Sequence, residues 1–203
     1  MSRQLLPIFP LSVVLLPAMP LPLHIFEPRY KEMIRDLGDP ADEFGIVLAK
    51  DEGIVNIGCS ARIDSITNRY DDGRLDLIAI GARRFQISSL DQTKAYVRAE
   101  IDFFDDENTP DPSTELTGRA LAAYRQLLQL EDVEEPDARS VRLSFQIGQL
   151  VRDLDKRQTL LALRSETERL EFLIKALPEY IARQQLAGLA KRVAPQNGHV
   201  KAL

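Results

Sequence analysis

Side chains that could act as nucleophiles, bases or metal ligands are few in this sequence of 203 residues. It contains two histidines, His24 and His199, and one cysteine, Cys59. This set is too small for a His/Cys zinc site at the usual ligand spacing. Phosphate-binding loops of the form G-x-x-x-x-G-K-[ST] or G-x-G-x-x-G do not occur, and neither does the G-x-S-x-G turn of serine hydrolases. The sequence therefore predicts no catalytic residue, no metal and no cofactor.

Cys59 and His24 leave one catalytic alternative open, in which the cysteine is a nucleophile and the histidine its base. A cysteine within a strand is more often a small buried residue, and we favour that interpretation for Cys59. We expect His24 to be structural as well, with a hydrogen bond to the backbone of a turn.

A group of arginines offers a second kind of chemistry, binding of RNA phosphates. It consists of Arg62, Arg69, Arg74, Arg83 and Arg84. The alternative, which we favour, is a solvated face on which these arginines pair with nearby aspartates, namely Asp64, Asp71, Asp72 and Asp76. The net charge of -5 and the pI near 5.2 also argue against a nucleic-acid partner, because phosphate binding usually requires a basic surface.

The most distinctive stretch runs from residue 5 to residue 30 and alternates prolines with apolar residues. Because proline has no N–H to donate, the stretch predicts short edge strands that wrap a β-core. Five of its side chains could grip an extended, unfolded segment by strand addition and side-chain pockets. They are Met19, Leu21, Leu23, His24 and Phe26. The alternative for the apolar members is burial in the core.

The remainder of residues 1–104 predicts a small mixed β-barrel. Pro28 suits the first turn of a helix that ends near Gly38. Apolar and alternating runs then predict strands at 44–49, 54–67, 74–80, 83–87 and 96–103. Asp72-Gly73 marks a hairpin turn, and Gly81 a bend between two strands.

Residues 105–113 are acidic, contain proline and lack periodicity, so they predict a solvated linker. Residues 114–195 have helical spacing and predict a helical bundle. We expect helices at 114–130, at 141–154, which Asp137 can cap, and from 166 onward, with a short helix or turn at 156–163. Ser165 and Glu168 have the spacing of a capping box. We expect Pro178 to end or kink the last helix, because proline in a helix interior costs about 3 kcal/mol. Residues 196–203 predict a flexible tail.

The fold class is therefore α+β, a mixed β-barrel followed by a C-terminal helical bundle. The opening stretch is too short and too rich in proline to span a membrane, and it lacks the pattern of a secretion signal. With a single cysteine, no intrachain disulfide can form. We expect a cytoplasmic protein.

Several motifs in order resemble one family. They are L-L-P-I-F-P-L-S-V-V-L-L-P-A-M-P-L-P-L-H-I-F-E-P-R-Y at residues 5–30, I-G-C-S-A-R-I at 57–63, D-D-G-R at 71–74, I-A-I-G-A-R-R-F-Q-I at 78–87 and D-K-R-Q-T-L-L-A-L-R-S-E-T-E-R-L-E-F-L at 155–173. Together they resemble the N-terminal, substrate-binding domain of Lon protease over residues 4–177.

The resemblance implies a PUA-like β-barrel followed by a helical bundle, and a role in recognising unfolded or damaged polypeptides. In the protease, the ATPase and the serine–lysine peptidase lie C-terminal to this domain, and no motif of either occurs here. We therefore expect a free-standing, non-enzymatic module that binds unfolded polypeptide or a protein partner, of unknown oligomeric state. An RNA-binding PUA-like protein and a small-molecule-binding protein remain the alternatives.

Overall fold

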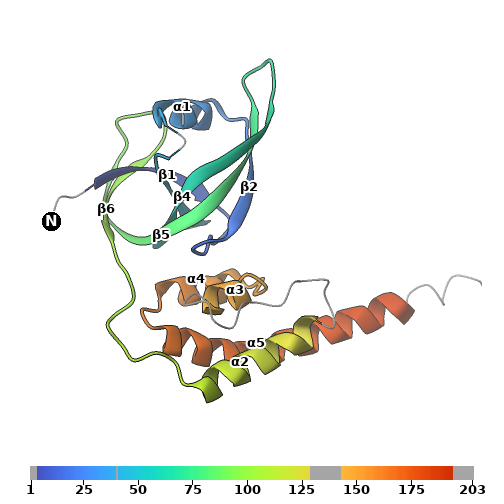
Figure 1. Cartoon of the computed structure of the whole chain (residues 1–203). Helices are drawn as coiled ribbons and strands as arrows, with labels where there is room; N and C mark the ends of the chain where they lie inside the picture. The colour runs from blue at the N-terminus through green and yellow to red at the C-terminus, as the bar shows by residue number, and fades with distance from the viewer. Residues whose placement is uncertain (1–3, 40, 129–142, 194–203) are drawn as a thin grey trace, which may run out of the picture.

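The computed structural model describes residues 4–39, 41–128 and 143–193. Six strands come first, with one helix between the second and the third (Figure 1). The strands are β1 (Gln4–Leu11), β2 (Pro20–Ile25), β3 (Phe44–Lys50), β4 (Gly53–Arg69), β5 (Leu75–Asp91) and β6 (Arg98–Phe103), and the helix is α1 (Pro28–Asp36). Helices α2 (Thr114–Leu128), α3 (Leu143–Gly148), α4 (Leu154–Ala162) and α5 (Glu166–Val193) follow.

The strands form one mixed sheet in the order β2-β5-β4-β3-β1-β6. An additional antiparallel pairing between β5 and β6 closes the last five of these strands into a ring. The β1–β3 pairing is parallel, and all others are antiparallel. The predicted α+β class, with a mixed strand ring before the helices, is confirmed.

The longest strands are β4 and β5, which form a hairpin of two 17-residue strands. Its turn contains Gly73 with φ +81°, as the Asp-Gly signal predicts. The prediction of separate strands at 74–80 and 83–87 is wrong, because β5 continues through Gly81. A Cβ atom at Gly81 would lie 2.3 Å from the carbonyl oxygen of Leu16. The glycine therefore permits close approach of another segment rather than a break in the strand.

The two halves of this hairpin have different neighbours. Near its base, β4 pairs with β3 and β5 pairs with β6, which completes the ring. The β3–β4 pairing ends at Phe44↔Ala61, and from residue 62 to 69 β4 pairs with β5 alone. On the other side of β5, residues 75–80 pair with β2. The outer half of the hairpin is therefore a three-stranded sheet, β2-β5-β4, with two open edges.

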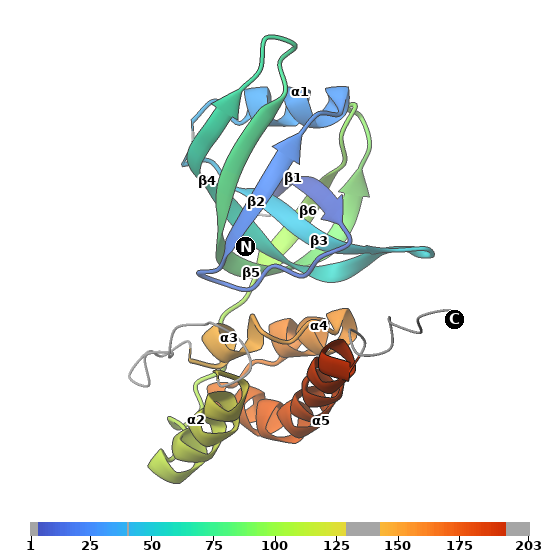
Figure 2. The same cartoon turned by 90° about the vertical axis from the view of Figure 1, so that its right-hand side faces the viewer.

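The helices form two layers below the strands. Helices α3 and α4 lie next to the ring, and α2 and α5 pack on their far side (Figures 1 and 2). The side-chain amide of Gln158 on α4 donates to the carbonyl of Ile57 on β4 at 3.0 Å. Leu15 and Leu16 belong to the same cluster of buried residues as Leu160 and Leu161 of α4. The strands and helices thus share a core. The division at 105–113 into two subdomains stays a prediction.

One predicted helix is shorter than expected. The helix expected to reach residue 154 ends with α3 at Gly148, and the chain leaves helical geometry before Asp153 begins α4. The carboxylate of Asp153 accepts a hydrogen bond from the backbone N–H of Lys156 and caps α4. Asp137, the expected cap, lies outside the described residues.

The helix does not end at Pro178, because α5 runs as a single element from Glu166 to Val193. Pro178 is exposed, whereas Leu177 and Ile181 on either side of it are buried. The apolar stripe that packs on the other helices continues across the proline. Its burial offsets the lost hydrogen bond, which is why local propensity misplaces the end of this helix. No helix in the described ranges has the length and apolar character needed to cross a membrane.

Candidate functional site

The five predicted contact residues occupy both faces of β2 and its flanks. Leu23 is 9% exposed and belongs to the core, and Met19 and Leu21 are partly buried against the same core. His24 and Phe26 lie on the outer face, where Phe26 is 57% exposed. The structure therefore brings His24 and Phe26 together on the surface and assigns Leu23 to packing.

His24 is the centre of a small surface cluster. Its ring stacks on Phe26 with centroids 5.7 Å apart, and Tyr70 from the end of β4 meets it edge-on at 6.0 Å. Its Nδ1 lies 2.5 Å from the Asp76 carboxylate, which also accepts a hydrogen bond from the Tyr70 hydroxyl at 2.7 Å. We call these four residues, His24, Phe26, Tyr70 and Asp76, the aromatic cluster. The prediction that His24 bonds to turn backbone is wrong, because its partner is the side chain opposite it in the β2–β5 register.

Asp76 is the electrostatic anchor of the aromatic cluster. Hydrogen bonds from His24 and then from Tyr70 hold the pKa of its carboxyl below the ordinary value. The same carboxylate raises the pKa of the Tyr70 hydroxyl, which therefore stays a donor at neutral pH. Because both rings are tied to one carboxylate, they are held in place before any partner arrives, and less conformational entropy is lost on binding.

The outer edge of β2 is poor in hydrogen-bond donors. The N–H of Gly81 donates to the carbonyl of Met19. This bond fixes which residues of β2 point their backbone N–H and C=O groups toward β5 and which point them away, because the two directions alternate along an antiparallel pair. In that alternation, the backbone of Leu21 and Leu23 faces β5, and the backbone of Pro20, Pro22 and His24 faces outward. Prolines cannot donate, so a chain adding to this edge would find few partners. Side-chain contact is the mode that this surface offers.

The arginines do not form one basic surface. Arg62 and Arg83 both contact Glu43, at 3.5 and 3.3 Å. Arg74 pairs with Asp72, as the favoured interpretation predicts. Arg84 differs from the prediction of a solvated residue, because it is only 5% exposed and faces the helices. The backbone of Arg69 pairs with Leu75 in the β4–β5 ladder, but among the described residues its guanidinium has no hydrogen bond or ion pair.

Asp106 is the residue that the sequence reasoning placed wrongly in a solvated linker. Its carboxylate bonds to the guanidinium groups of Arg84 and Arg169, at 2.5 Å each. Arg169 is 1% exposed and also contacts Glu166, the Ser144 hydroxyl and the Leu163 carbonyl. We call Arg84, Asp106 and Arg169 the interface triad. No local pattern points to it, because the arginines lie 22 and 63 residues away along the chain.

Burial and hydrogen bonding oppose each other in the interface triad. Burial alone would raise the pKa of the Asp106 carboxyl, but the hydrogen bonds and charges of Arg169 and Arg84 outweigh it and hold that pKa below its ordinary value. Burial would likewise lower the pKa of Arg169, and the bonds to Asp106 and Glu166 raise it. The triad therefore stays ionised and joins the β5 strand, the connecting segment and the helices.

Cys59 is fully buried in β4, as predicted, and its thiol contacts the Ser60 carbonyl at 3.3 Å. His24 is exposed on β2 and engaged with Asp76, so the structure does not bring the two together as nucleophile and base. Within the described parts of the chain, no group of three or more His, Cys, Asp or Glu side chains could hold a metal ion.

These features define a class: a mixed strand ring with C-terminal helices, an exposed aromatic cluster and open strand edges. Comparison with known proteins gives the family. Residues 5–179 match the family described as the ATP-dependent protease La (LON) substrate-binding domain, and the chain belongs to that family. The resemblance found in the sequence motifs is thus confirmed.

Two solved structures are similar to this chain. A Lon N-terminal domain protein from Xanthomonas campestris has 27% sequence identity and a TM-score of 0.70, and the match covers 85% of this chain and 98% of that one. The N-terminal domain of a Mycobacterium avium complex Lon protease has 19% identity and a TM-score of 0.64, with 86% and 98% covered. At that identity, the second likeness concerns the fold alone.

Proposed function

We propose that this protein is a non-catalytic polypeptide-recognition module that binds unfolded segments, or a partner protein, through the outer face of β2. The observation that carries the proposal is the aromatic cluster, in which a phenylalanine 57% exposed stacks on a histidine fixed by Asp76. Exposed aromatic side chains held rigidly provide much apolar contact area at low entropic cost. Membership of a family described as substrate-binding supports the same function.

The mode of recognition follows from the edge of β2. Because Pro20 and Pro22 withhold backbone donors from the outer edge, the bound segment contacts side chains rather than extending the sheet there. Met19 and Leu21 are packed against the core, so the contact surface is formed by the exposed rings on the outer face. The partner is an apolar segment, either of an unfolded chain or of a partner protein.

The test uses a permanently unfolded protein, reduced and carboxymethylated α-lactalbumin, and measures its binding by fluorescence anisotropy. We expect the wild-type protein to bind it and Phe26→Ser to weaken binding at least tenfold, because the ring provides most of the exposed apolar area. Leu90→Ser is the matched control, since Leu90 is 49% exposed on the far end of β5. Absence of wild-type binding, or equal loss in both variants, contradicts the proposal.

A further inference from the structure

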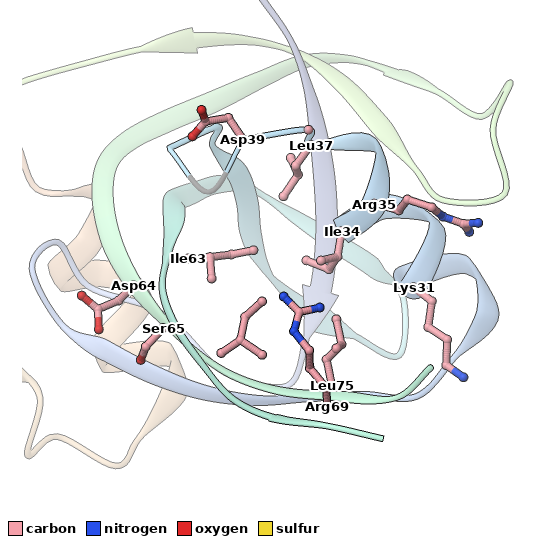
Figure 3. A pocket seen from close by; sticks show the side chains of 12 residues that line it. Lys31, Ile34, Arg35, Leu37, Asp39, Ile63, Asp64, Ser65, Arg69 and Leu75 are labelled. Carbon is pink, nitrogen blue, oxygen red and sulfur yellow. The ribbon is translucent and has the colours of Figure 1, made fainter. Parts of the chain in front are cut away.

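We propose that a second site, the groove between α1 and the open edge of β4, binds the C-terminal end of an extended apolar polypeptide, with Arg69 receiving its carboxylate. This inference rests on the proposed polypeptide-binding function and assigns it a separate site. The groove has a volume of about 540 Å³ (Figure 3). Its lining residues come from three elements and the turn after α1: Lys31, Ile34, Arg35, Leu37, Gly38, Asp39, Ile63, Asp64, Ser65, Ile66, Arg69 and Leu75.

The open edge of β4 provides the backbone partners. Pairing between β3 and β4 ends at Phe44↔Ala61, whereas β4 continues to Arg69 against β5 alone. An extended chain could therefore occupy the position that a longer β3 would fill, and hydrogen-bond to the edge by strand addition. Unlike the outer edge of β2, residues 62–69 contain no proline, so their N–H groups can donate.

The groove has an apolar floor. Ile34 on α1 and Leu37, the residue directly after α1, line the groove together with Ile63 and Ile66 on β4. Leu75 on β5 completes the surface. All except Leu37 are only partly buried, so a ligand side chain would remove more of their apolar area from water. Such a floor selects aliphatic side chains at the end of the bound chain.

Charge is distributed unevenly along the groove. Figure 3 shows Lys31 and Arg35 on one side of it and Asp39 and Asp64 on the other. The guanidinium of Arg69 points into the groove toward Ile34 (Figure 3). It has neither a hydrogen bond nor an ion pair among the described residues, so its donors are available to a ligand. An arginine next to an apolar floor matches a carboxylate attached to an apolar residue.

The direction of the bound chain follows from these charges. A chain that runs parallel to β4 places its C-terminal carboxylate at Arg69 and its preceding residues along Ile66 and Ile63. The ammonium of Lys31 donates to the Asp72 carbonyl at 2.9 Å and joins α1 to the hairpin turn just beyond Arg69. This link obstructs a chain that would continue past the arginine. The site therefore suits a chain end rather than an internal segment.

The experiment compares two peptides that differ only at the C-terminus. The full chain is titrated against fluorescein-labelled Ser-Gly-Val-Ile-Ala-Leu as the free acid and as the C-terminal amide, with anisotropy as the readout. We expect the free acid to bind at least tenfold more tightly, because the amide cannot form the charge-assisted bonds to Arg69. Equal binding of acid and amide, or binding of neither, overturns this proposal.

Variants assign the effect to the groove. Arg69→Gln should remove the difference between acid and amide, whereas Arg62→Gln should retain it, since Arg62 lies on the same strand and pairs with Glu43. Both arginines are exposed, so neither change should unfold the protein. A difference that persists in Arg69→Gln also overturns the proposal.

The two proposals can fail separately. If Phe26→Ser no longer binds the unfolded protein while the acid and amide peptides bind equally well, the groove proposal is wrong and the β2 proposal is supported. If the acid peptide depends on Arg69 while Phe26→Ser binds unfolded protein normally, polypeptide recognition belongs to the groove and the β2 surface is rejected.

Discussion

The interface triad should contribute strongly to stability, and replacing Asp106 with asparagine tests this. The carboxylate of Asp106 takes three hydrogen bonds from two guanidinium groups that are 5% and 1% exposed. The asparagine side chain would lose the charge and keep one acceptor oxygen. Arg84 and Arg169 would then remain buried beside fewer acceptors.

The magnitude follows from burial. Removing one partner of a fully buried ion pair costs about 3–5 kcal/mol, because the other charge is left uncompensated. The side chain of Asp106 is 37% exposed, so water partly screens it. Arg169 also keeps Glu166, and Arg84 keeps the carbonyls of Leu161 and Leu163. We therefore expect Asp106→Asn to lower the free energy of unfolding by about 2–3 kcal/mol.

The assay is urea unfolding followed by circular dichroism, with the free energy obtained by linear extrapolation. Asp105→Asn is the matched control, because it removes the same charge at the adjacent exposed position. The control should change the free energy by no more than about 0.5 kcal/mol. If the two variants have equal stability, the triad does not stabilise the protein and the reasoning is refuted.

The pH dependence gives an independent check with a defined sign. The pKa of Asp106 in the folded protein lies below its ordinary value of 3.8, so its stabilisation is complete above that value and is lost as pH falls toward the folded pKa. The stability difference between wild type and Asp106→Asn should therefore be constant from about pH 7 to pH 5 and shrink below about pH 4. A difference that grows on acidification would contradict the assignment.

Four further substitutions test the packing. Gly118→Ala in α2 should raise the free energy of unfolding by about 0.5–1 kcal/mol, because the added Cβ atom would have no other atom within 4 Å. Gly81→Ala should lower the free energy of unfolding, because its Cβ atom would lie 2.3 Å from the Leu16 carbonyl oxygen. Urea unfolding distinguishes these opposite changes. Pro178→Ala should stabilise α5 by up to about 3 kcal/mol and increase the helical signal in circular dichroism, and an unchanged melting temperature would argue against it. Leu16→Ala should cost about 2–5 kcal/mol, because Leu16 is fully buried in the core shared by strands and helices; a loss below about 1 kcal/mol would indicate that the two parts do not stabilise each other.

Local signals in the sequence predicted much of the fold. Pro28 begins α1, Gly73 lies in the β4–β5 turn and Ser165 caps α5, because proline geometry, positive φ and helix capping depend on a few adjacent residues. The order of strands before helices and the family motifs were likewise readable along the chain. The binding surface at β2 stays a prediction, and alternation disturbed by prolines could not tell buried Leu23 from exposed Phe26.

Tertiary structure alone decided the features that join distant segments. Asp106 forms an ion pair with Arg169, 63 residues further along the chain. Pro178 is tolerated within α5 because the packing of the helix continues beyond it. Gly81 allows the backbone of Leu16 to approach closely. The open edge of β4 exists because β3 stops pairing at Ala61, which no pattern within β4 could indicate. Periodicity and propensity report how each segment prefers to fold. The partners available to a buried charge, a strand edge or a small residue depend on which other segments lie beside it.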